Sequence, residues 1–130
     1  MIRLLVVEDH NLVRQGIIKL LNGQQDMEVV AEAENGRKAL DLLENGTQAD
    51  IVLADFNMPE MDGVALTEHI LLKYNWIEVI ILTMHVRDEF IDRALKAGAK
   101  GYVLKNGDFN DLYNGIRKVF QGEIHVTSEL

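Results

Sequence analysis

Charged and polar side chains follow several short apolar runs of the sequence, at the points where those runs end. Glu8 and Asp9 come directly after the first run, and Asp55 ends the run that begins at residue 51. Thr83 and Lys105 stand in the equivalent places after two later runs. If the runs are neighbouring parallel strands, their carboxyl ends meet at one edge of a sheet, and these side chains gather there.

This combination of carboxylates, a hydroxyl and an ammonium suits phosphoryl transfer assisted by a cation. Three unpaired carboxylates repel one another, and at least one of their pKa values then rises. Mg²⁺, and also Mn²⁺, relieves the repulsion because it prefers oxygen ligands and binds carboxylates together with a phosphate. Asp55 is then placed to attack a phosphoryl donor, while Lys105 adds a positive charge and Thr83 a hydroxyl donor. Taken singly, each residue is more often a turn, cap or surface residue.

The loop after Asp55, residues 56–63, supports this interpretation. Pro59 fixes φ within the turn, and Gly63 is expected to take a positive φ before the next helix. The backbone carbonyl of Asn57 is a candidate ligand for the cation. The alternative is that the loop only connects a strand rigidly to the next helix. The loop makes this connection whether or not it also binds a cation.

The apolar runs have the character of strands in a parallel sheet. Three are continuous and rich in β-branched residues, which is typical of strands buried on both faces, and two weaker ones are expected at the edges. The expected strands are 4–7, 51–54 and 79–82, with 28–33 and 101–104 as the edge strands. Amphipathic helical stripes lie between them. Asn35 and Asp108 are candidate N-caps, and Gly23, Gly46 and Gly122 stand where helices should stop.

Strands that alternate with helices predict an α/β fold. Each right-handed crossover places its helix on one face of a parallel sheet. We therefore expect a doubly wound, flavodoxin-like sheet of five strands in the order 2-1-3-4-5, flanked by five helices. Such sheets bind ligands at the carboxyl ends of their strands, where the polar residues above are expected.

Length, charge and composition exclude several other classes of protein. The chain has 130 residues, no cysteine and a formal charge of −8, so it has the size of one domain and contains no disulfide or thiolate metal site. The acidic balance argues against direct binding of nucleic acid by this segment. Because no run has the length of a membrane span and no signal peptide is visible, a cytoplasmic location is expected. Histidines 10, 69 and 125 show no metal-ligand spacing.

Together these residues resemble the receiver domain of bacterial two-component response regulators. The resemblance covers residues 3 to about 121, and its marks are Glu8-Asp9, the segment 53–63 (LADFNMPEMDG), Leu82-Thr83 and Lys105. It implies that Asp55 accepts the phosphoryl group from a sensor histidine kinase or a small acyl phosphate. It also implies that Mg²⁺ is surrounded by Glu8, Asp9, Asp55 and the Asn57 carbonyl. Lys105 is then the phosphate-binding lysine, and Thr83 and Tyr102 are the switch residues.

A second set of residues is similar to the NarL/LuxR-type subfamily. These are the segments 82–85 (LTMH), 98–105 (GAKGYVLK) and 122–125 (GEIH). In that subfamily a helix-turn-helix DNA-binding domain follows the receiver, and dimerisation is common. The resemblance therefore implies a receiver at 1–121 and a tail or linker at 122–130. It further implies control of transcription by an output domain outside this chain, with a homodimer on phosphorylation as one form of the active state.

Three positions depart from or refine the family pattern. Many receivers have a proline after the lysine, often with a cis bond, but here the residue is Asn106. A trans bond is expected, because a cis bond before a non-proline residue costs about 2.5–4 kcal/mol. Asn57 and His85 flank the phosphoryl site in the family and are expected to tune access of the hydrolytic water. The alternatives are a solvated loop imidazole for His85 and a half-buried strand aromatic for Tyr102.

The expected function is a switch that catalyses only its own phosphorylation and dephosphorylation, rather than a conventional enzyme. Phosphorylation would draw Thr83 toward the phosphoryl oxygens and let Tyr102 rotate inward, which changes the surface of the last strand and helices. One alternative is a Mg²⁺-dependent phosphohydrolase of the haloacid dehalogenase type. That class needs a second aspartate at the position of Asn57 and usually has a cap domain, and both requirements disfavour it. Others are a flavodoxin-like cofactor binder, disfavoured by the acidic first loop, and a pseudo-receiver used only for docking.

Overall fold

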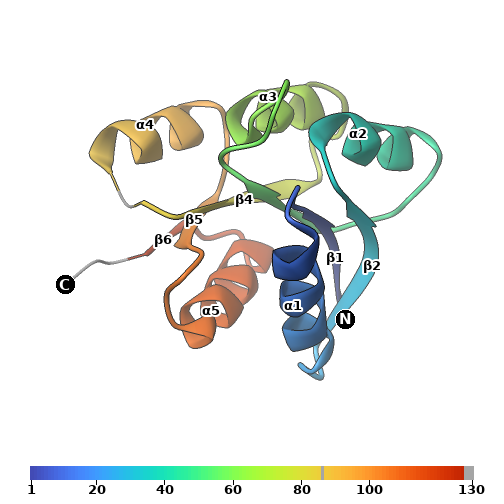
Figure 1. The fold of residues 1–130 in the computed structure, drawn as a ribbon, viewed down its shortest axis with the longest axis vertical. Coiled ribbons are helices and arrows are strands. Elements are labelled where there is room, and N and C mark those ends of the chain that lie inside the picture. The colour runs from blue at the N-terminus through green and yellow to red at the C-terminus, as the bar shows by residue number, and fades with distance from the viewer. Residues whose placement is uncertain (86, 128–130) are drawn as a thin grey trace.

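A parallel sheet of six strands forms the centre of the computed structural model, which describes residues 1–85 and 87–127 (Figure 1). The strands are β1 (Ile2–Val7), β2 (Met27–Ala33), β3 (Ile51–Asp55), β4 (Glu78–Thr83), β5 (Gly101–Leu104) and β6 (His125–Val126). The helices are α1 (Asn11–Asn22), α2 (Gly36–Glu44), α3 (Gly63–Lys73), α4 (Asp88–Lys96) and α5 (Phe109–Phe120). Helices α1 and α5 cover one face of the sheet, and α2, α3 and α4 cover the other. The predicted doubly wound α/β fold with five helices is confirmed.

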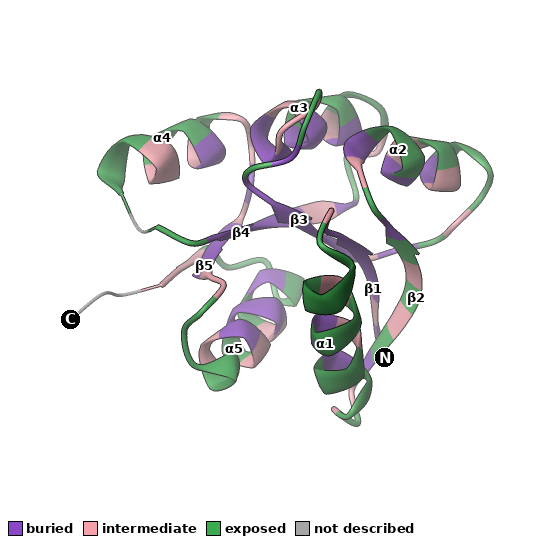
Figure 2. Cartoon of the chain, viewed as in Figure 1, coloured by how far each residue is buried: buried purple, intermediate pink, exposed green. Residues whose placement is uncertain are grey.

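The apolar runs of the sequence form two hydrophobic cores, one on each face of the sheet (Figure 2). Successive residues of a strand point to opposite faces. Leu5 and Val52 therefore join the core beneath α2, α3 and α4, whereas Leu4 and Leu53 join the core beneath α1 and α5. All four are fully buried, which explains why the central strands appear as unbroken apolar runs. The edge strand β2 instead alternates between buried and exposed residues.

The helices begin and end largely where the sequence indicates. The side chains of Asn35 and Asp108 each accept a hydrogen bond from a backbone N–H of the following first turn, at 2.8 and 2.9 Å, so both predicted N-caps are confirmed. Gly46 and Gly122 follow α2 and α5 with φ values of 103° and 92°, a conformation that favours glycine. Within the described part of the chain, no helix has both the length and the apolar character needed to cross a bilayer.

The carboxyl-terminal segment differs from the prediction. The sequence predicts five strands, an edge at 101–104 and a tail from residue 122, but His125–Val126 adds a sixth strand parallel to β5. The predicted count is wrong by one because a two-residue strand contains no apolar run for a sequence pattern to detect. The predicted order 2-1-3-4-5 is otherwise correct, and β6 extends it next to β5.

The amino ends of the strands lie opposite the expected site and carry a different set of contacts. Arg3 at the start of β1 makes hydrogen bonds to the Asp50 carboxylate, including one of 3.0 Å from Nη2. Trp76, the single tryptophan, lies between α3 and β4 and is 67% exposed. Its ring meets that of Tyr74 edge-on, with 5.6 Å between the ring centroids.

Candidate functional site

Three ionisable side chains from three strands meet at the carboxyl edge of the sheet. Glu8 follows β1, Asp55 ends β3 and Lys105 follows β5. The Lys105 ammonium lies 2.5 Å from Oε1 of Glu8 and 3.4 Å from Oδ2 of Asp55. Glu8 is fully buried, Asp55 is 4% exposed and the side chain of Lys105 is 9% exposed. The structure thus brings together, away from water, three residues that lie 47 and 50 positions apart in the sequence.

The charges of this cluster change the pKa values of its two buried carboxyl groups in opposite directions. Burial raises the pKa of Asp55 to about 6, and the charge of Glu8 adds to this increase while Lys105 opposes it. Burial acts on Glu8 in the same sense, but hydrogen bonds from Lys105 and from the backbone of His10 outweigh it and lower the pKa of Glu8 to about 2. Glu8 and Lys105 are therefore a buried ion pair, and Asp55 retains uncompensated negative charge when it ionises.

An oxygen of Asp9 completes an arrangement that suits a divalent cation. Among the described residues, Glu8, Asp9, His10 and Asp55 each offer one ligand atom, and these atoms lie within 4.8 Å of one another. Oδ1 of Asp9 is buried and accepts no hydrogen bond from the described residues, although Nδ1 of His10 lies 3.3 Å away, and a cation or water would satisfy this oxygen. Oxygen donors with excess negative charge match the preference of Mg²⁺ and Mn²⁺. The residues present therefore fit such an ion.

Two side chains outside the sequence motif support the loop that carries Glu8 and Asp9. Nδ1 of His10 lies 3.1 Å from Oε2 of Glu8 and 3.3 Å from Oδ1 of Asp9. Arg14 donates one 2.8 Å hydrogen bond to the backbone carbonyl of Glu8 and another to Glu32 on β2. The position of His10 directly after the two acids is a signal that could have identified it. No local spacing links Arg14 to Glu32, because only the packing of α1 beside β2 brings them together.

The loop after Asp55 is fixed by contacts to Asp55 and its neighbour. The backbone N–H of Asn57 lies 3.4 Å from Oδ1 of Asp55, and the N–H of Gly63 donates to the carbonyl of Phe56 at 3.0 Å. A Cβ at Gly63 would lie 2.5 Å from the backbone oxygen of Asp55, so this close approach requires glycine. The predicted positive φ at Gly63 is wrong. The left-handed residue of the loop is Glu60, with φ of 70°.

Thr83, His85 and Tyr102 form a hydrogen-bonded group at the ends of β4 and β5. The Tyr102 hydroxyl donates to the backbone carbonyl of His85 at 2.9 Å, and the Thr83 hydroxyl lies 3.2 Å from both the carbonyl and the N–H of His85. The Tyr102 ring is fully buried and meets Phe56 edge-on at 6.5 Å between centroids. Tyr102 is therefore more deeply buried than a half-buried strand aromatic, and its ring already lies inward. His85 is exposed and joins this group through its backbone.

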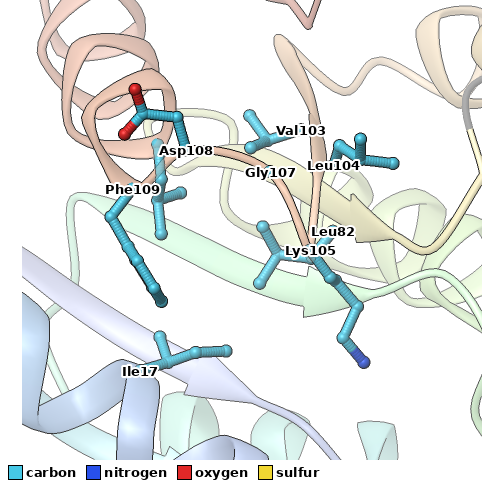
Figure 3. Close-up of a pocket in the computed structure, with 9 residues that line it drawn as sticks. Ile17, Leu82, Val103, Leu104, Lys105, Gly107, Asp108 and Phe109 are labelled. Carbon is cyan, nitrogen blue, oxygen red and sulfur yellow. The ribbon is translucent and has the colours of Figure 1, made fainter.

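A small apolar pocket lies behind Lys105, between β5 and the helices α1 and α5 (Figure 3). Its lining includes Ile17, Leu82 and Leu112, together with the stem of Lys105. Figure 3 shows the Lys105 nitrogen directed away from Asp108, so the apolar stem packs while the charged end reaches the carboxylates. All peptide bonds of the described residues are trans, and the bond after Lys105 therefore has the expected isomer.

Known proteins share both the sequence pattern and the architecture. Residues 4–117 match the family model described as the response regulator receiver domain. Response regulator GacA of Pseudomonas protegens is 37% identical over 130 residues, which are 100% of this chain and 61% of that protein. Transcriptional regulatory protein DegU of Brevibacillus brevis is 34% identical over 125 residues, which are 96% of this chain and 52% of that protein. The chain thus spans about half to two thirds of the length of these curated relatives.

Solved structures of regulators superpose closely on this chain. A LuxR-family two-component response regulator from Aurantimonas sp. SI85-9A1 has a TM-score of 0.89 at 34% identity and covers 95% of this chain and 87% of its own. The isolated receiver domain of RcsB from Salmonella enterica serovar Typhimurium, with the phosphomimetic BeF₃⁻, has a TM-score of 0.88 at 25% identity over 98% and 94%. The chain therefore belongs to the response regulator receiver domain family, with LuxR/NarL-type regulators among its relatives.

Proposed function

We propose that this chain is a phosphorylation-dependent switch in which Asp55 accepts a phosphoryl group and Lys105 binds it. The proposal depends above all on the burial of Asp55 beside the Lys105 ammonium and beside an oxygen of Asp9 that accepts no hydrogen bond from the described residues. Residues 1–121 would form the phosphoacceptor domain. The switch would act in the cytoplasm and would catalyse only its own phosphorylation and dephosphorylation.

In the proposed reaction, a carboxylate oxygen of Asp55 attacks the phosphorus of the donor. A new P–O bond forms as the bond to the leaving group breaks. That group departs as acetate from acetyl phosphate, or as imidazole from a phosphohistidine that carries its proton on the other ring nitrogen. The protein need not remove a proton, but Asp55 must be ionised, which is the state favoured above its pKa of about 6.

The surrounding residues would stabilise the transferred group by charge. Mg²⁺ or Mn²⁺ would be held by Glu8, Asp9, Asp55 and the carbonyl of Asn57, and when bound it would withdraw charge from the phosphoryl oxygens. Lys105 is already 3.4 Å from Asp55, so a small shift away from Glu8 would bring its ammonium to a phosphoryl oxygen. The ion pair with Glu8 keeps the Lys105 ammonium in the site before the phosphoryl donor binds.

Thr83 and Tyr102 would carry the phosphorylation signal to the surface. The Thr83 hydroxyl contacts the backbone of His85, and turning toward a phosphoryl oxygen would break that contact. Tyr102 contacts the same carbonyl. Because the ring already lies inward, we propose that the His85 carbonyl is released in place of the inward rotation expected from the sequence. Asn57 and His85 border this site and would tune the access of the hydrolytic water.

A sensor histidine kinase is the proposed donor, and a helix-turn-helix DNA-binding domain is the proposed output. The names of similar proteins support this proposal: DegU is a transcriptional regulatory protein, and one RcsB structure contains dimers bound to DNA. Residues 122–130 would lead toward such a domain, and a homodimer would be one form of the active state. The charge of −8 makes direct contact of this segment with DNA unfavourable.

Incubation with acetyl phosphate and Mg²⁺, followed by intact-mass measurement, tests the proposal. We expect one added phosphoryl group, lost when EDTA removes the metal and lost in Asp55→Asn. Asp92→Asn, on the exposed side of α4, is the matched control and should be labelled like the natural chain. Equal labelling of Asp55→Asn would refute the assignment of Asp55.

Intact-mass labelling together with a phosphate-release assay distinguishes the switch from a phosphohydrolase of the haloacid dehalogenase type. That class needs an acid/base aspartate two residues after its nucleophile, and the residue here is Asn57. The matched family is the receiver domain. A switch takes up at most one phosphoryl group per chain, whereas repeated release of phosphate from a simple phosphomonoester would favour the phosphohydrolase.

A further inference from the structure

The segment 123–127 is attached to the last strand of the domain by backbone hydrogen bonds, and we call it the strap. The N–H of His125 donates to the Lys100 carbonyl at 2.9 Å, and the N–H of Thr127 donates to the Tyr102 carbonyl at 2.8 Å. The side chain of Val126 packs against the core beneath α2, α3 and α4. The strap thus covers the edge of β5 (Figure 1) and shares the hydrophobic core.

The Asp111 side chain of α5 and a backbone N–H of β5 make this attachment specific. Oδ1 of Asp111 lies 2.9 Å from Nε2 of His125, and Oδ2 accepts a 2.6 Å hydrogen bond from the Thr127 hydroxyl. The same hydroxyl oxygen accepts the N–H of Leu104 at 3.0 Å. The His125 ring lies over Gly115, where a Cβ would come within 2.8 Å of Cδ2. Both oxygens of Asp111 contact the strap, and the missing side chain of Gly115 leaves room for the His125 ring. These contacts favour this segment over another segment that could pair with β5.

The residues of β5 that bind the strap adjoin the candidate site. Leu104, whose N–H binds Thr127, immediately precedes Lys105, whose ammonium contacts Glu8. Tyr102 binds the Thr127 N–H through its carbonyl and the His85 carbonyl through its hydroxyl. Hydrogen bonds weaken steeply when their length and angle change. Because Lys105 continues directly from this strand, a movement of its backbone would change the geometry of the bonds that hold the strap.

We propose that the strap is docked while Lys105 is paired with Glu8 and loosens when Asp55 carries a phosphoryl group. The surface formed by β5 and Asp111 thereby couples the site to the chain that continues from Thr127. The docking of the strap does not depend on the proposed function of Asp55, whereas its coupling to phosphorylation rests on that function. Coupling through a shared strand is reciprocal, so a mutation that undocks the strap favours the phosphoryl-bound state to the extent that it populates the undocked form.

Backbone amide hydrogen exchange, measured by NMR without any phosphoryl donor, tests the docking. Thr127→Val removes the hydroxyl and keeps the shape, and Gly115→Ala fills the seat of His125 while it strengthens the helix. Both variants should accelerate exchange of the amide at position 127, relative to the intrinsic rate of the residue there, about fivefold or more and leave β3 protected. Thr47→Val, in the loop between α2 and β3, is the matched control. Unchanged protection at position 127 in both variants would overturn the docking.

Beryllium fluoride with Mg²⁺, used as a reversible mimic of the phosphoryl group, tests the coupling. Saturation of the natural chain should accelerate exchange at Thr127 and Leu104 about fivefold, and Thr127→Val should bind the mimic at least as tightly as the natural chain. Thr47→Val should bind like the natural chain. Binding with unchanged exchange at Thr127 would overturn the coupling alone. Failure to bind, together with no labelling of Asp55 by acetyl phosphate, would overturn the proposed function and the coupling with it.

Discussion

Lys105 donates to Glu8 across 2.5 Å, a shorter contact than the 3.4 Å that separates its ammonium from Asp55. Glu8 therefore neutralises most of the charge of Lys105, and Asp55 keeps the net negative charge that attracts a cation. The ammonium nevertheless remains close enough to repel that cation. One lysine thus opposes binding of the metal and assists binding of the phosphoryl group.

Lys105→Met is therefore expected to change two measurements in opposite directions. Loss of a positive charge beside the carboxylates should increase Mg²⁺ affinity about tenfold, which corresponds to about 1.4 kcal/mol. Labelling by acetyl phosphate should become at least about tenfold slower, because the phosphoryl oxygens lose a cationic partner. Calorimetric titration and intact-mass time courses give the two values, with Lys118→Met on the exposed side of α5 as the control. Labelling at the natural rate would contradict the role of Lys105.

The raised pKa of Asp55 predicts a pH-dependent gain of stability in Asp55→Asn. The folded chain holds the Asp55 proton more tightly than the unfolded chain does, so ionisation of Asp55 destabilises the fold. This destabilisation is complete above pH 6 or so and absent below about pH 4, the ordinary pKa of aspartate. Without metal, Asp55→Asn should raise the free energy of unfolding by on the order of 2 kcal/mol at pH 7.5 and hardly at pH 4.

Urea unfolding followed by circular dichroism in EDTA measures this difference at both pH values. Asp92→Asn on the exposed side of α4 is the matched control for the removal of one carboxylate. A gain of the same size for Asp55→Asn at pH 4 and pH 7.5 would show that its cause is not the charge of Asp55.

The buried oxygen of Asp9, which accepts no hydrogen bond from the described residues, predicts that Mg²⁺ stabilises the folded chain. An ion that binds only the folded state at ten times its Kd adds about 1.4 kcal/mol, which raises the Tm of a domain of this size by about 5 °C. EDTA should reverse the shift, and Asp9→Asn should remove most of it. Differential scanning fluorimetry with an added dye provides the measurement. A full shift in Asp9→Asn would exclude this oxygen from the site.

The contact between Gly63 and the backbone oxygen of Asp55 predicts a strong effect of a single methyl group. Gly63→Ala should destabilise the chain by about 1–3 kcal/mol, because its Cβ has no room against the backbone. Gly16→Ala is the matched control: a Cβ there meets nothing within 4 Å, and alanine favours the helix by about 1 kcal/mol. Chemical denaturation should therefore give opposite signs for the two variants, and equal signs would rule out the steric explanation.

The position of Arg14 predicts that the shape of its side chain matters as well as its charge. Arg14→Lys keeps the charge but cannot contact the Glu8 carbonyl and Glu32 with a planar fork. The loop that carries Asp9 should loosen, and Mg²⁺ affinity should fall about fivefold with little change in Tm. Arg37→Lys on the exposed face of α2 is the control. An unchanged titration curve for Arg14→Lys would limit Arg14 to a surface role.

The layers of the fold and the meeting of Glu8, Asp55 and Lys105 could be predicted because they follow from one rule. Continuous apolar runs predict strands buried on both faces, and parallel strands bring their carboxyl ends to one edge. The residue after each run was therefore sufficient to locate the site. The caps at Asn35 and Asp108 could also be predicted, because each depends on a local hydrogen bond.

Features that depend on contacts between distant segments could not be predicted in this way. The strap depends on Asp111 meeting His125 and Thr127, and no periodic pattern encodes that meeting. Gly63 was correctly singled out but for the wrong reason, because its requirement is close approach to Asp55 and not a positive φ. Such requirements become visible only when the packing partner is known.

The place of Trp76 has a practical consequence for anyone who studies this chain by optical methods. The indole lies at the amino end of β4, and the carboxylates lie beyond the other end of the same sheet. Its emission will report loss of the fold in that region and will stay silent when ligands occupy the acidic edge. Fluorescence detection of a ligand bound at the acidic edge therefore requires a fluorophore attached to the loop after β1, β3 or β5.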